Sequence, residues 1–414
     1  MADGNRPPQD VPQTILELMP DNPAARDNPH ALLKALRETC PVMRDETIKT
    51  WLLTRYRDIR ETSNDRSFVR HPSKAEPGTL AGGGGPREGQ EPPPEAPLSM
   101  LFLDDPDHSR VRLPIAKAFY ARIHRMRPDI EAMIDSVIEA APLSGRFDLM
   151  ELIAVPIPIL VIARILGVDE DRLVEFRKWS EQVILGLKPA RTPEEDMQLF
   201  SGGMALMAYF TELMEARRAD PKDDLVTDLV QMQASGEADL RDEELRSNLL
   251  GLLVGGNLTT TDLIGNGIWL FLTHPEQAAL LRAQPQLASQ AVEEVLRYEA
   301  PVTMSSRIVP DARTVGGCPM SKGQPVWMML PAANRDPEIF EAPEVFDITL
   351  KRTGHVAFGG GSHICIGAPL ARIEARQVYL KLLTRYPNLR LPEQEFSWRP
   401  LPFFRGLETL IVEA

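Results

Sequence analysis

Cysteine is scarce in this chain, which has three cysteines in 414 residues. Cys40, Cys318 and Cys365 lie far apart, are odd in number and lack the close spacing of metal ligands. They therefore argue against a disulfide framework and against a zinc site. We expect Cys40 and Cys318 to be plain buried or partly buried thiols, whereas Cys365 lies in a different sequence context.

A surplus of basic charge is also missing. The chain has 46 lysines and arginines against 59 aspartates and glutamates, a formal net charge of −13. Because phosphate repels an acidic surface, this balance argues against nucleic-acid binding. The first ten residues contain no basic region followed by an apolar run, so we expect neither a signal peptide nor a membrane anchor, and a cytoplasmic protein.

An uninterrupted apolar run long enough to cross a membrane is absent as well. The longest apolar stretch lies between Glu243 and His274, but four polar residues interrupt it: Asn248, Asn257, Asp262 and Asn266. Gly255 and Gly256 interrupt its middle and three threonines follow, and both features weaken a helical hydrogen-bond ladder. The stretch predicts a buried helix with a local groove.

Helical periodicity dominates what is present. Apolar residues recur at helical spacing over ten stretches: 31–39, 110–121, 126–140, 149–166, 169–185, 195–217, 222–233, 241–273, 276–298 and 368–385. Short strand-like pieces lie towards both ends of the chain: 51–53, 302–308, 326–329 and 407–411. The predicted fold class is mainly α with a small β subdomain. We expect a flexible N-terminal tail over 1–20, a single domain over 21–414, and a mobile Gly- and Pro-rich loop over 76–97.

The string FGGGSHICIG, residues 358–367, surrounds Cys365 with features suited to a metal-bound thiolate. An apolar-periodic helix is predicted to begin just after it, and a helix N-terminus stabilises a thiolate. The glycines allow the backbone to lie close against a flat group. A glycine-rich turn with an incidental cysteine is the plainer alternative.

This string resembles the haem-ligand loop of the cytochrome P450 family, whose pattern is Phe, Gly, any, Gly, any, His or Arg, any, Cys, any, Gly. Six residues match it: Phe358, Gly359, Gly361, His363, Cys365 and Gly367. The resemblance implies that the cofactor is haem b and that Cys365 is its proximal iron ligand. It also implies that Phe358 packs beside the sulfur and that His363 reaches a haem propionate.

A second motif, EEVLR, places Glu294 and Arg297 three residues apart on one helix face. Such a pair is most often a solvated salt bridge worth about 0–1 kcal/mol. Upstream of the cysteine loop, it resembles the family's Glu-x-x-Arg pair, which has a structural role. An arginine often completes that cluster, but its usual place in the string PEVF is taken by Val345, so the third partner stays open.

Basic residues that could bind propionates occur in the expected order. His108 and Arg112 are four apart on a predicted helix that opens after Pro106, and they resemble the family's propionate-binding helix. Arg307 resembles the strand arginine with the same role. Taken singly, each could be an ordinary surface charge.

The segment that corresponds to the family's oxygen-activating helix departs from the pattern. The family has Ala or Gly, Gly, any, Asp or Glu, Thr, whereas this chain has Gly255, Gly256, Asn257, Leu258, Thr259. The alcohol of Thr259 is kept and the acid is lost, which puts the usual supply of protons in doubt. Asn257, Asp262 or an ordered water could substitute.

The resemblance also implies a substrate pocket. Its expected residues are Val254, Gly255, Thr259, Val302, Thr303, Met304, Ser305, Phe403 and Phe404. Since none of them is basic, we expect a small to medium neutral, hydrophobic substrate. Lys188 and Arg191, in a segment expected to roof the pocket, leave an acidic substrate open.

The implied activity is that of a haem-thiolate monooxygenase, with Thr259 as the distal hydrogen-bonding group. Electrons are expected from NADH or NADPH through a ferredoxin reductase and a ferredoxin, which would dock on a basic patch: Arg110, Lys117, Arg122, Arg125, Arg372 and Arg376. A solvated helix face is the alternative for these charges. Alternatives for the function are a haem-thiolate enzyme that uses peroxide or rearranges its substrate, and a non-catalytic haem-binding protein.

Overall fold

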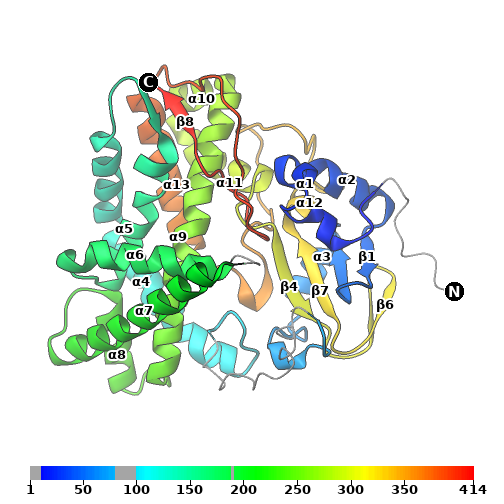
Figure 1. Cartoon of the computed structure of the whole chain (residues 1–414), viewed down its shortest axis with the longest axis horizontal. Helices are drawn as coiled ribbons and strands as arrows, with labels where there is room; N and C mark the ends of the chain where they lie inside the picture. The colour runs from blue at the N-terminus through cyan, green and yellow to red at the C-terminus, as the bar shows by residue number, and fades with distance from the viewer. Residues whose placement is uncertain (1–10, 80–98, 188–190) are drawn as a thin grey trace. The chain divides into compact units, whose positions relative to one another are not determined.

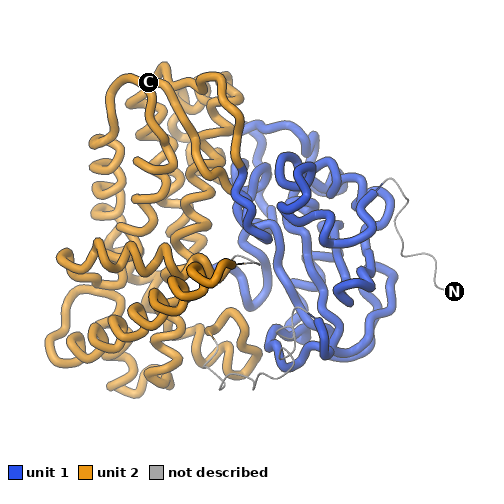
Figure 2. Tube along the Cα trace, viewed as in Figure 1, with its two compact units in different colours: residues 1–96, 293–365, 398–405 blue, residues 97–292, 366–397, 406–414 orange. Residues whose placement is uncertain are grey.

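A computed structural model describes residues 11–79, 99–187 and 191–414. The chain forms two compact units that interleave along the sequence (Figure 2). Unit 1 comprises Met1–Ala96, Glu293–Cys365 and Trp398–Arg405, and unit 2 comprises Pro97–Val292, Ile366–Ser397 and Gly406–Ala414. Within the described ranges, no helix combines the length and apolar character that crossing a bilayer requires.

Unit 2 is mainly helical (Figure 1). Its α-helices are α4 (Asp107–Ala140), α5 (Pro156–Leu166), α6 (Leu173–Ile184), α7 (Pro193–Ala219), α8 (Leu225–Ala234), α9 (Asp242–Thr273), α10 (Pro275–Ala283) and α13 (Ala368–Arg385). Short helical turns are η4 (Met150–Ala154), η5 (Glu170–Arg172), η6 (Leu185–Leu187) and η7 (Pro285–Leu287). Two short strands, β3 (Arg146–Asp148) and β8 (Ile411–Glu413), pair antiparallel.

Helices α9 and α13 pack side by side in unit 2 (Figure 1). The buried Tyr379 hydroxyl of α13 donates a 2.5 Å hydrogen bond to the Leu263 carbonyl of α9. A β-carbon at Gly267 would lie 2.1 Å from that hydroxyl, so the close approach requires glycine there. These contacts fix the position of α9, which carries the predicted oxygen-activating residues.

Unit 1 contains a four-stranded sheet in the order β1-β2-β7-β4. Its strands are β1 (Val42–Asp45), β2 (Thr50–Leu53), β7 (Pro325–Met329) and β4 (Met304–Ile308); β5 (Arg313–Val315) and β6 (Cys318–Met320) form a separate hairpin. The β2–β7 pair is parallel, and the β1–β2 and β4–β7 pairs are antiparallel. All residues of β2 and β7 are buried, which places these strands in the core.

Short helices accompany this sheet. They are η1 (Ile15–Leu18), α1 (Pro23–Asp27), α2 (Pro29–Thr39), α3 (Tyr56–Asn64), η2 (Pro72–Lys74), α12 (Leu330–Asn334) and η8 (Gly361–His363). Helix α11 (Ala288–Tyr298) spans the boundary between the two units along the chain. The fold is therefore mainly α with a small β portion, which confirms the predicted class.

Several predicted boundaries are wrong. The stretches 110–121 and 126–140 form one helix, α4, because the buried face continues through Ile123, Met126 and Ile130 despite Pro128. The predicted helix 276–298 is broken at Pro285, where η7 separates α10 from α11.

The predicted flexible segments are described only in part. Residues 1–10 and 80–97 lie outside the described residues. Residues 11–20, which we expected to belong to a flexible tail, are packed: Ile15 is fully buried and its N–H donates to the Asp45 carboxylate at 2.7 Å. At the start of the predicted loop, the Glu76 N–H donates to the Gly323 carbonyl at 2.8 Å. Burial of Ile15 offsets the entropy cost that made these residues look mobile.

Candidate active site

The loop around Cys365 is held in one conformation by its own backbone. The Cys365 N–H donates to the Phe358 carbonyl at 2.9 Å. Gly359 and Gly361 have φ values of 72° and 66°, and a β-carbon at Gly361 would lie 2.1 Å from the Ser63 carbonyl oxygen. The loop thus needs glycine both for backbone geometry and for its close approach to α3.

The three cysteines differ in exposure. Cys365 is exposed, whereas Cys40 and Cys318 are buried, and none of the three forms a disulfide. Burial raises the pKa of the Cys40 thiol, with a further contribution from Cys318. The two buried residues are packing thiols, as predicted, whereas the Cys365 thiol is exposed.

Arg307 connects the sheet of unit 1 with the Cys365 loop. It lies on β4, is 3% exposed, and donates at 3.3 Å to the carbonyls of Ser63 and Gly360. His363 lies in η8, within the same loop. Arg307 therefore contacts the loop that contains both His363 and Cys365. Two basic residues thus lie in or against this loop.

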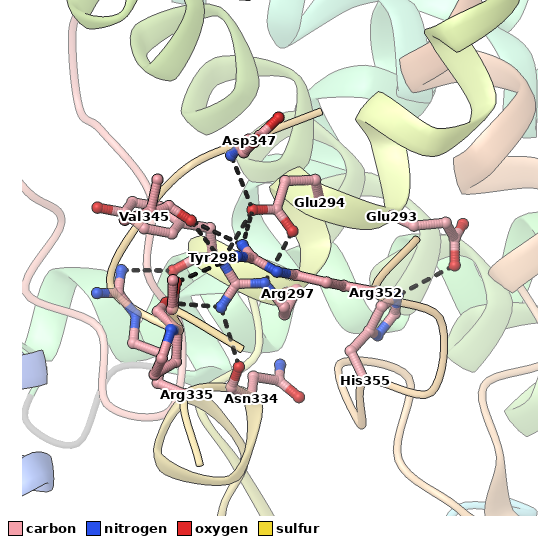
Figure 3. Close-up of polar contacts among 12 residues, drawn as sticks. Glu293, Glu294, Arg297, Tyr298, Asn334, Arg335, Val345, Asp347, Arg352 and His355 are labelled. Atoms are coloured by element: carbon pink, nitrogen blue, oxygen red, sulfur yellow. Dashed lines mark hydrogen bonds and ion pairs between the residues drawn. The ribbon is translucent and has the colours of Figure 1, made fainter. Parts of the chain in front are cut away.

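Glu294 and Arg297 form a buried ionic cluster (Figure 3). Two Arg297–Glu294 hydrogen bonds measure 2.8 Å, and both side chains are 0% exposed. Arg352 is the third partner, with its guanidinium 2.7 Å from Glu294. The guanidinium of Arg297 also donates to three backbone carbonyls: Asn334, Pro343 and Val345. The solvated-bridge alternative is therefore wrong for this pair, and Arg352 was not predicted as its partner.

The predicted propionate ligands of unit 2 share one face of α4. His108 is 2% exposed, its ring lies 3.8 Å from the Asp105 carboxylate, and Arg112, one turn later, is half-buried. Helix α4 begins at Asp107, directly after Pro106, as predicted. The two basic side chains thus lie on the same face of α4 because they are four residues apart.

On α9, the hydroxyl of Thr259 donates to the Gly255 carbonyl at 2.7 Å, and Leu258 is buried. Asp262 follows Thr259 by three residues and therefore lies on the same face, but it is 1% exposed and its carboxylate packs against Gly406. Asn257 lies roughly 160° around the helix from Thr259. The structure thus places Thr259 and Asp262 on one face and Asn257 on another.

The predicted pocket residues of unit 1 come from two segments that pair through their backbones. The Thr303 N–H donates to the Phe403 carbonyl at 2.9 Å, and Val302 forms a bridge with Phe404. Met304 and Phe403 pack against the same apolar cluster around β2 and β7, whereas Ser305 pairs with Met328 in the sheet. The remaining pocket residues, Val254 and Gly255, lie on α9 in unit 2.

Most residues of the predicted basic patch form ion pairs with acidic residues that we did not predict as their partners. Lys117 lies 2.5 Å from Glu237, and Arg125 lies 3.0 Å from Asp228. Arg122 is 1% exposed and also pairs with Asp228, so its assignment to a surface patch is wrong. Two of the remaining three residues are also paired: Arg110 binds Glu244 at 2.6 Å and Arg376 binds Glu131 at 2.8 Å.

An acid that sequence reasoning missed lies on α13. Glu374 is 1% exposed, and within the part of the chain that the structure describes its Oε2 atom has no hydrogen-bond partner. Burial raises the pKa of Glu374 to about 8, so the carboxyl is mostly protonated at neutral pH.

This burial predicts an unusual pH dependence of stability. The ordinary pKa of a glutamate is 4.5, and that of Glu374 in the folded chain is about 8. Between these two pH values, Glu374 keeps its proton in the folded chain and has lost it in the unfolded chain. The free energy of unfolding should therefore fall by about 1.4 kcal/mol per pH unit over that window. Glu374→Gln should remove this slope, while Glu215→Gln, at an exposed position, should keep it. Urea unfolding at several pH values measures both, and an unchanged slope in Glu374→Gln would contradict the prediction.

Comparison with known proteins shows the family of this chain. The family model of cytochrome P450 matches residues 190–401. Cytochrome P450 107B1 of Saccharopolyspora erythraea is 37% identical over 406 residues, covering 95% of this chain and 96% of the relative. The chain belongs to the cytochrome P450 family. This P450 is therefore an oxidoreductase whose cofactor is haem b.

Solved structures share the fold of this P450. Mycobacterium smegmatis CYP164A2 with econazole bound has a TM-score of 0.86 and 32% identity, covering 97% of this chain and 99% of that one. P450BioI, in complex with an acyl carrier protein ligated to hexadec-9Z-enoic acid, has a TM-score of 0.82 and 32% identity, covering 94% and 98%.

The residues present fit a haem. The chain offers an exposed thiol in a glycine loop whose backbone is already fixed, which suits a planar group with a sulfur ligand. Arginine and histidine side chains suit carboxylates such as those of the porphyrin: unit 1 offers Arg307 and His363 at the Cys365 loop, and unit 2 separately offers His108 and Arg112 on α4.

Proposed function

We propose that this P450 is a haem-thiolate monooxygenase that oxidises a small to medium, largely apolar organic substrate. One atom of dioxygen enters the substrate and the other leaves as water, at the expense of two electrons and two protons. The exposed Cys365 thiol in its fixed loop is the observation that carries this proposal. When bound, haem supplies oxygen activation, and a thiolate ligand favours O–O cleavage.

Different residues of the chain have different proposed roles in binding haem and substrate. Cys365 supplies the sulfur ligand, and Phe358 and Gly367 shape the loop on either side of it. Four basic side chains would hold the propionates of the bound haem: His108, Arg112, Arg307 and His363. Apolar residues such as Val302 and Phe404 exclude water from the substrate.

The Thr259 hydroxyl is the proposed hydrogen-bonding group for proton delivery. Its hydrogen bond to the Gly255 carbonyl holds the oxygen in place on α9, and Asp262 on the same face is the acid closest to it along the helix. Asn257, the other residue predicted for this role, lies on another face of the helix. Leu258 cannot donate or accept a proton.

The buried Leu258 also supports a second candidate function, a haem-thiolate enzyme that uses peroxide or rearranges its substrate. A ferredoxin with its NADH- or NADPH-dependent reductase is the proposed electron source for the monooxygenase, working in the cytoplasm. The deciding experiment supplies both routes to the purified holoenzyme with a panel of apolar compounds. Product that requires NADH, ferredoxin and dioxygen supports the monooxygenase. Product formed only with peroxide, or formed with neither peroxide nor electrons, supports the alternative, and the absence of product under every condition would leave a non-catalytic haem-binding protein.

The loss of the acid at position 258 predicts waste of electrons. Without a carboxylate beside Thr259, the native enzyme should release part of its reducing equivalents as hydrogen peroxide. Leu258→Glu should raise the product formed per NADH consumed, although burial would raise the pKa of the new acid and limit the gain. Leu258→Gln is the matched control, because it adds polarity without an acid. A native enzyme that is already tightly coupled would contradict the prediction.

A further inference from the structure

A turn near the C-terminal end of unit 1 has a costly backbone conformation. Its first and last residues are joined by a hydrogen bond of 3.3 Å from the Phe404 N–H to the Leu401 carbonyl. Phe403, inside the turn, has a φ of 70°, a left-handed conformation that bulky residues rarely adopt. Such residues persist only where surrounding contacts hold them, and they are concentrated at functional sites.

Backbone hydrogen bonds join this turn to the segment that leads into β4. The N–H groups of Arg405 and Thr303 donate to carbonyls of the facing segment at 2.8 and 2.9 Å. Phe404 consequently lies opposite Val302, and opposed residues of an antiparallel pair direct their side chains to the same face. Because both side chains are half-buried, Val302 and Phe404 form one apolar face.

The ring of Phe403 is used in packing. It lies edge-on against Trp327, with 5.1 Å between the ring centres, and Trp327 belongs to the buried apolar cluster of the sheet. Phe403 therefore has a structural role, and Phe404 is the aromatic residue of the turn that we assign to contact with a substrate.

A buried ion pair holds the turn from its C-terminal side. The Arg405 guanidinium pairs with Glu299, and the two residues are 7% and 2% exposed. The same guanidinium donates to the Arg26 carbonyl at 2.7 Å and lies 3.6 Å from the Trp398 ring centre. Because removing one partner of a buried ion pair leaves an uncompensated charge, this pair resists separation. It fixes the residue directly after Phe404.

We propose that Arg405 and Glu299 are positioning residues for the substrate. Their ion pair keeps the turn in its costly conformation and holds Phe404 beside Val302 as an apolar wall. The place of this wall determines which apolar molecules this P450 accepts. The inference rests on the proposed function. Neither residue was predicted from the sequence, because the two are 106 positions apart.

The test measures ligand binding to the holoenzyme without turnover. Imidazole and 4-phenylimidazole both bind haem iron through a nitrogen and shift the haem absorption band, but only the second carries an apolar ring. We expect the wild type to bind 4-phenylimidazole at least about tenfold more tightly, because the wall buries that ring. Arg405→Ala and Glu299→Gln should each reduce this affinity ratio about fivefold or more and leave imidazole binding unchanged. Arg405→Lys keeps the charge without the fork and should recover part of the ratio.

Two substitutions at Phe403 separate the conformation of the turn from the aromatic ring. Both Phe403→Gly and Phe403→Val remove the ring. Glycine adopts the left-handed conformation without steric cost, whereas the branched β-carbon of valine strongly disfavours it. Phe403→Val should therefore lower the affinity ratio as Arg405→Ala does, and Phe403→Gly should keep most of it.

Arg122→Ala is the matched control. It also removes a buried arginine from an ion pair, in this case with Asp228 of unit 2, and should leave the affinity ratio unchanged. The haem spectrum of each variant reports that the holoenzyme is folded. Three results would overturn the proposal: an unchanged ratio in Arg405→Ala and Phe403→Val, equal losses in Phe403→Gly and Phe403→Val, or an equal loss in Arg122→Ala.

This design separates the positioning role from the reaction. If the affinity ratios change as expected but the wild type oxidises no compound, only the proposed monooxygenase is refuted. If the wild type is an active monooxygenase and the ratio survives in the turn variants, only the positioning role is refuted.

Discussion

Replacing Cys365 with serine or histidine is expected to abolish both oxygenation and the absorption band at about 450 nm of the reduced, carbon-monoxide-treated holoenzyme. The band depends on a thiolate ligand, and neither hydroxyl nor imidazole donates electron density as a thiolate does. Cys365 is the exposed thiol of the three, so its replacement removes no buried packing. We therefore expect these variants to stay folded while losing the P450 spectrum.

The other two cysteines are the matched controls. Cys40→Ala and Cys318→Ala should keep the band and the activity, because both thiols are buried in apolar clusters of unit 1. Their expected effect is a modest loss of stability from the small cavity left behind, about 1 kcal/mol. A band that survives in Cys365→Ser, or disappears in Cys40→Ala, would refute the assignment of the ligand.

Arg297→Ala should lower the free energy of unfolding by about 3–5 kcal/mol. The substitution leaves the fully buried Glu294 with Arg352 and the Asp347 N–H. It also removes a donor from the carbonyls of Asn334, Pro343 and Val345, of which the last still accepts from Arg352. Arg297→Lys keeps the charge but cannot reproduce the forked contacts, so it should recover only part of the loss.

Urea unfolding of the holoenzyme measures this effect. Arg177→Ala provides the control, because the helical pair Arg177–Glu181 has a similar distance, 2.9 Å, with side chains 46% and 54% exposed. That change should cost less than about 0.5 kcal/mol. Equal losses in the two variants would mean that burial gives the Glu294–Arg297–Arg352 cluster no special role.

Much of the helical framework could be predicted from the sequence because helices are local. Helix α13 occupies Ala368–Arg385, the range expected from apolar periodicity, and α9 is displaced by only one residue. Helix α3 was missed because its sequence, YRDIRETSN, is mostly polar and contains only two large residues with apolar character, Tyr56 and Ile59. Proline was misleading in both directions, since Pro128 lies within α4 and Pro285 interrupts a predicted helix.

For the site, predictability also depended on separation along the chain. The Cys365 loop could be predicted because all of its motif residues lie within ten positions. Arg352 could not be predicted as the partner of Glu294, because the two residues are 58 positions apart. The acids that neutralise the basic residues of α4 lie about a hundred residues further on. No short window of sequence reports such contacts.

The parallel pairing of β2 with β7 has a consequence for how this protein is made. Trp51 pairs with Val326, so the hairpin β1–β2 leaves the ribosome about 275 residues before the strand that covers its edge. At about 5–20 residues per second, that interval lasts roughly 15–55 s. During this time an apolar strand edge is open to pairing with other nascent chains. Production of this P450 should therefore depend on chaperones that bind early and on slow, cool expression more than on the final stability of the fold.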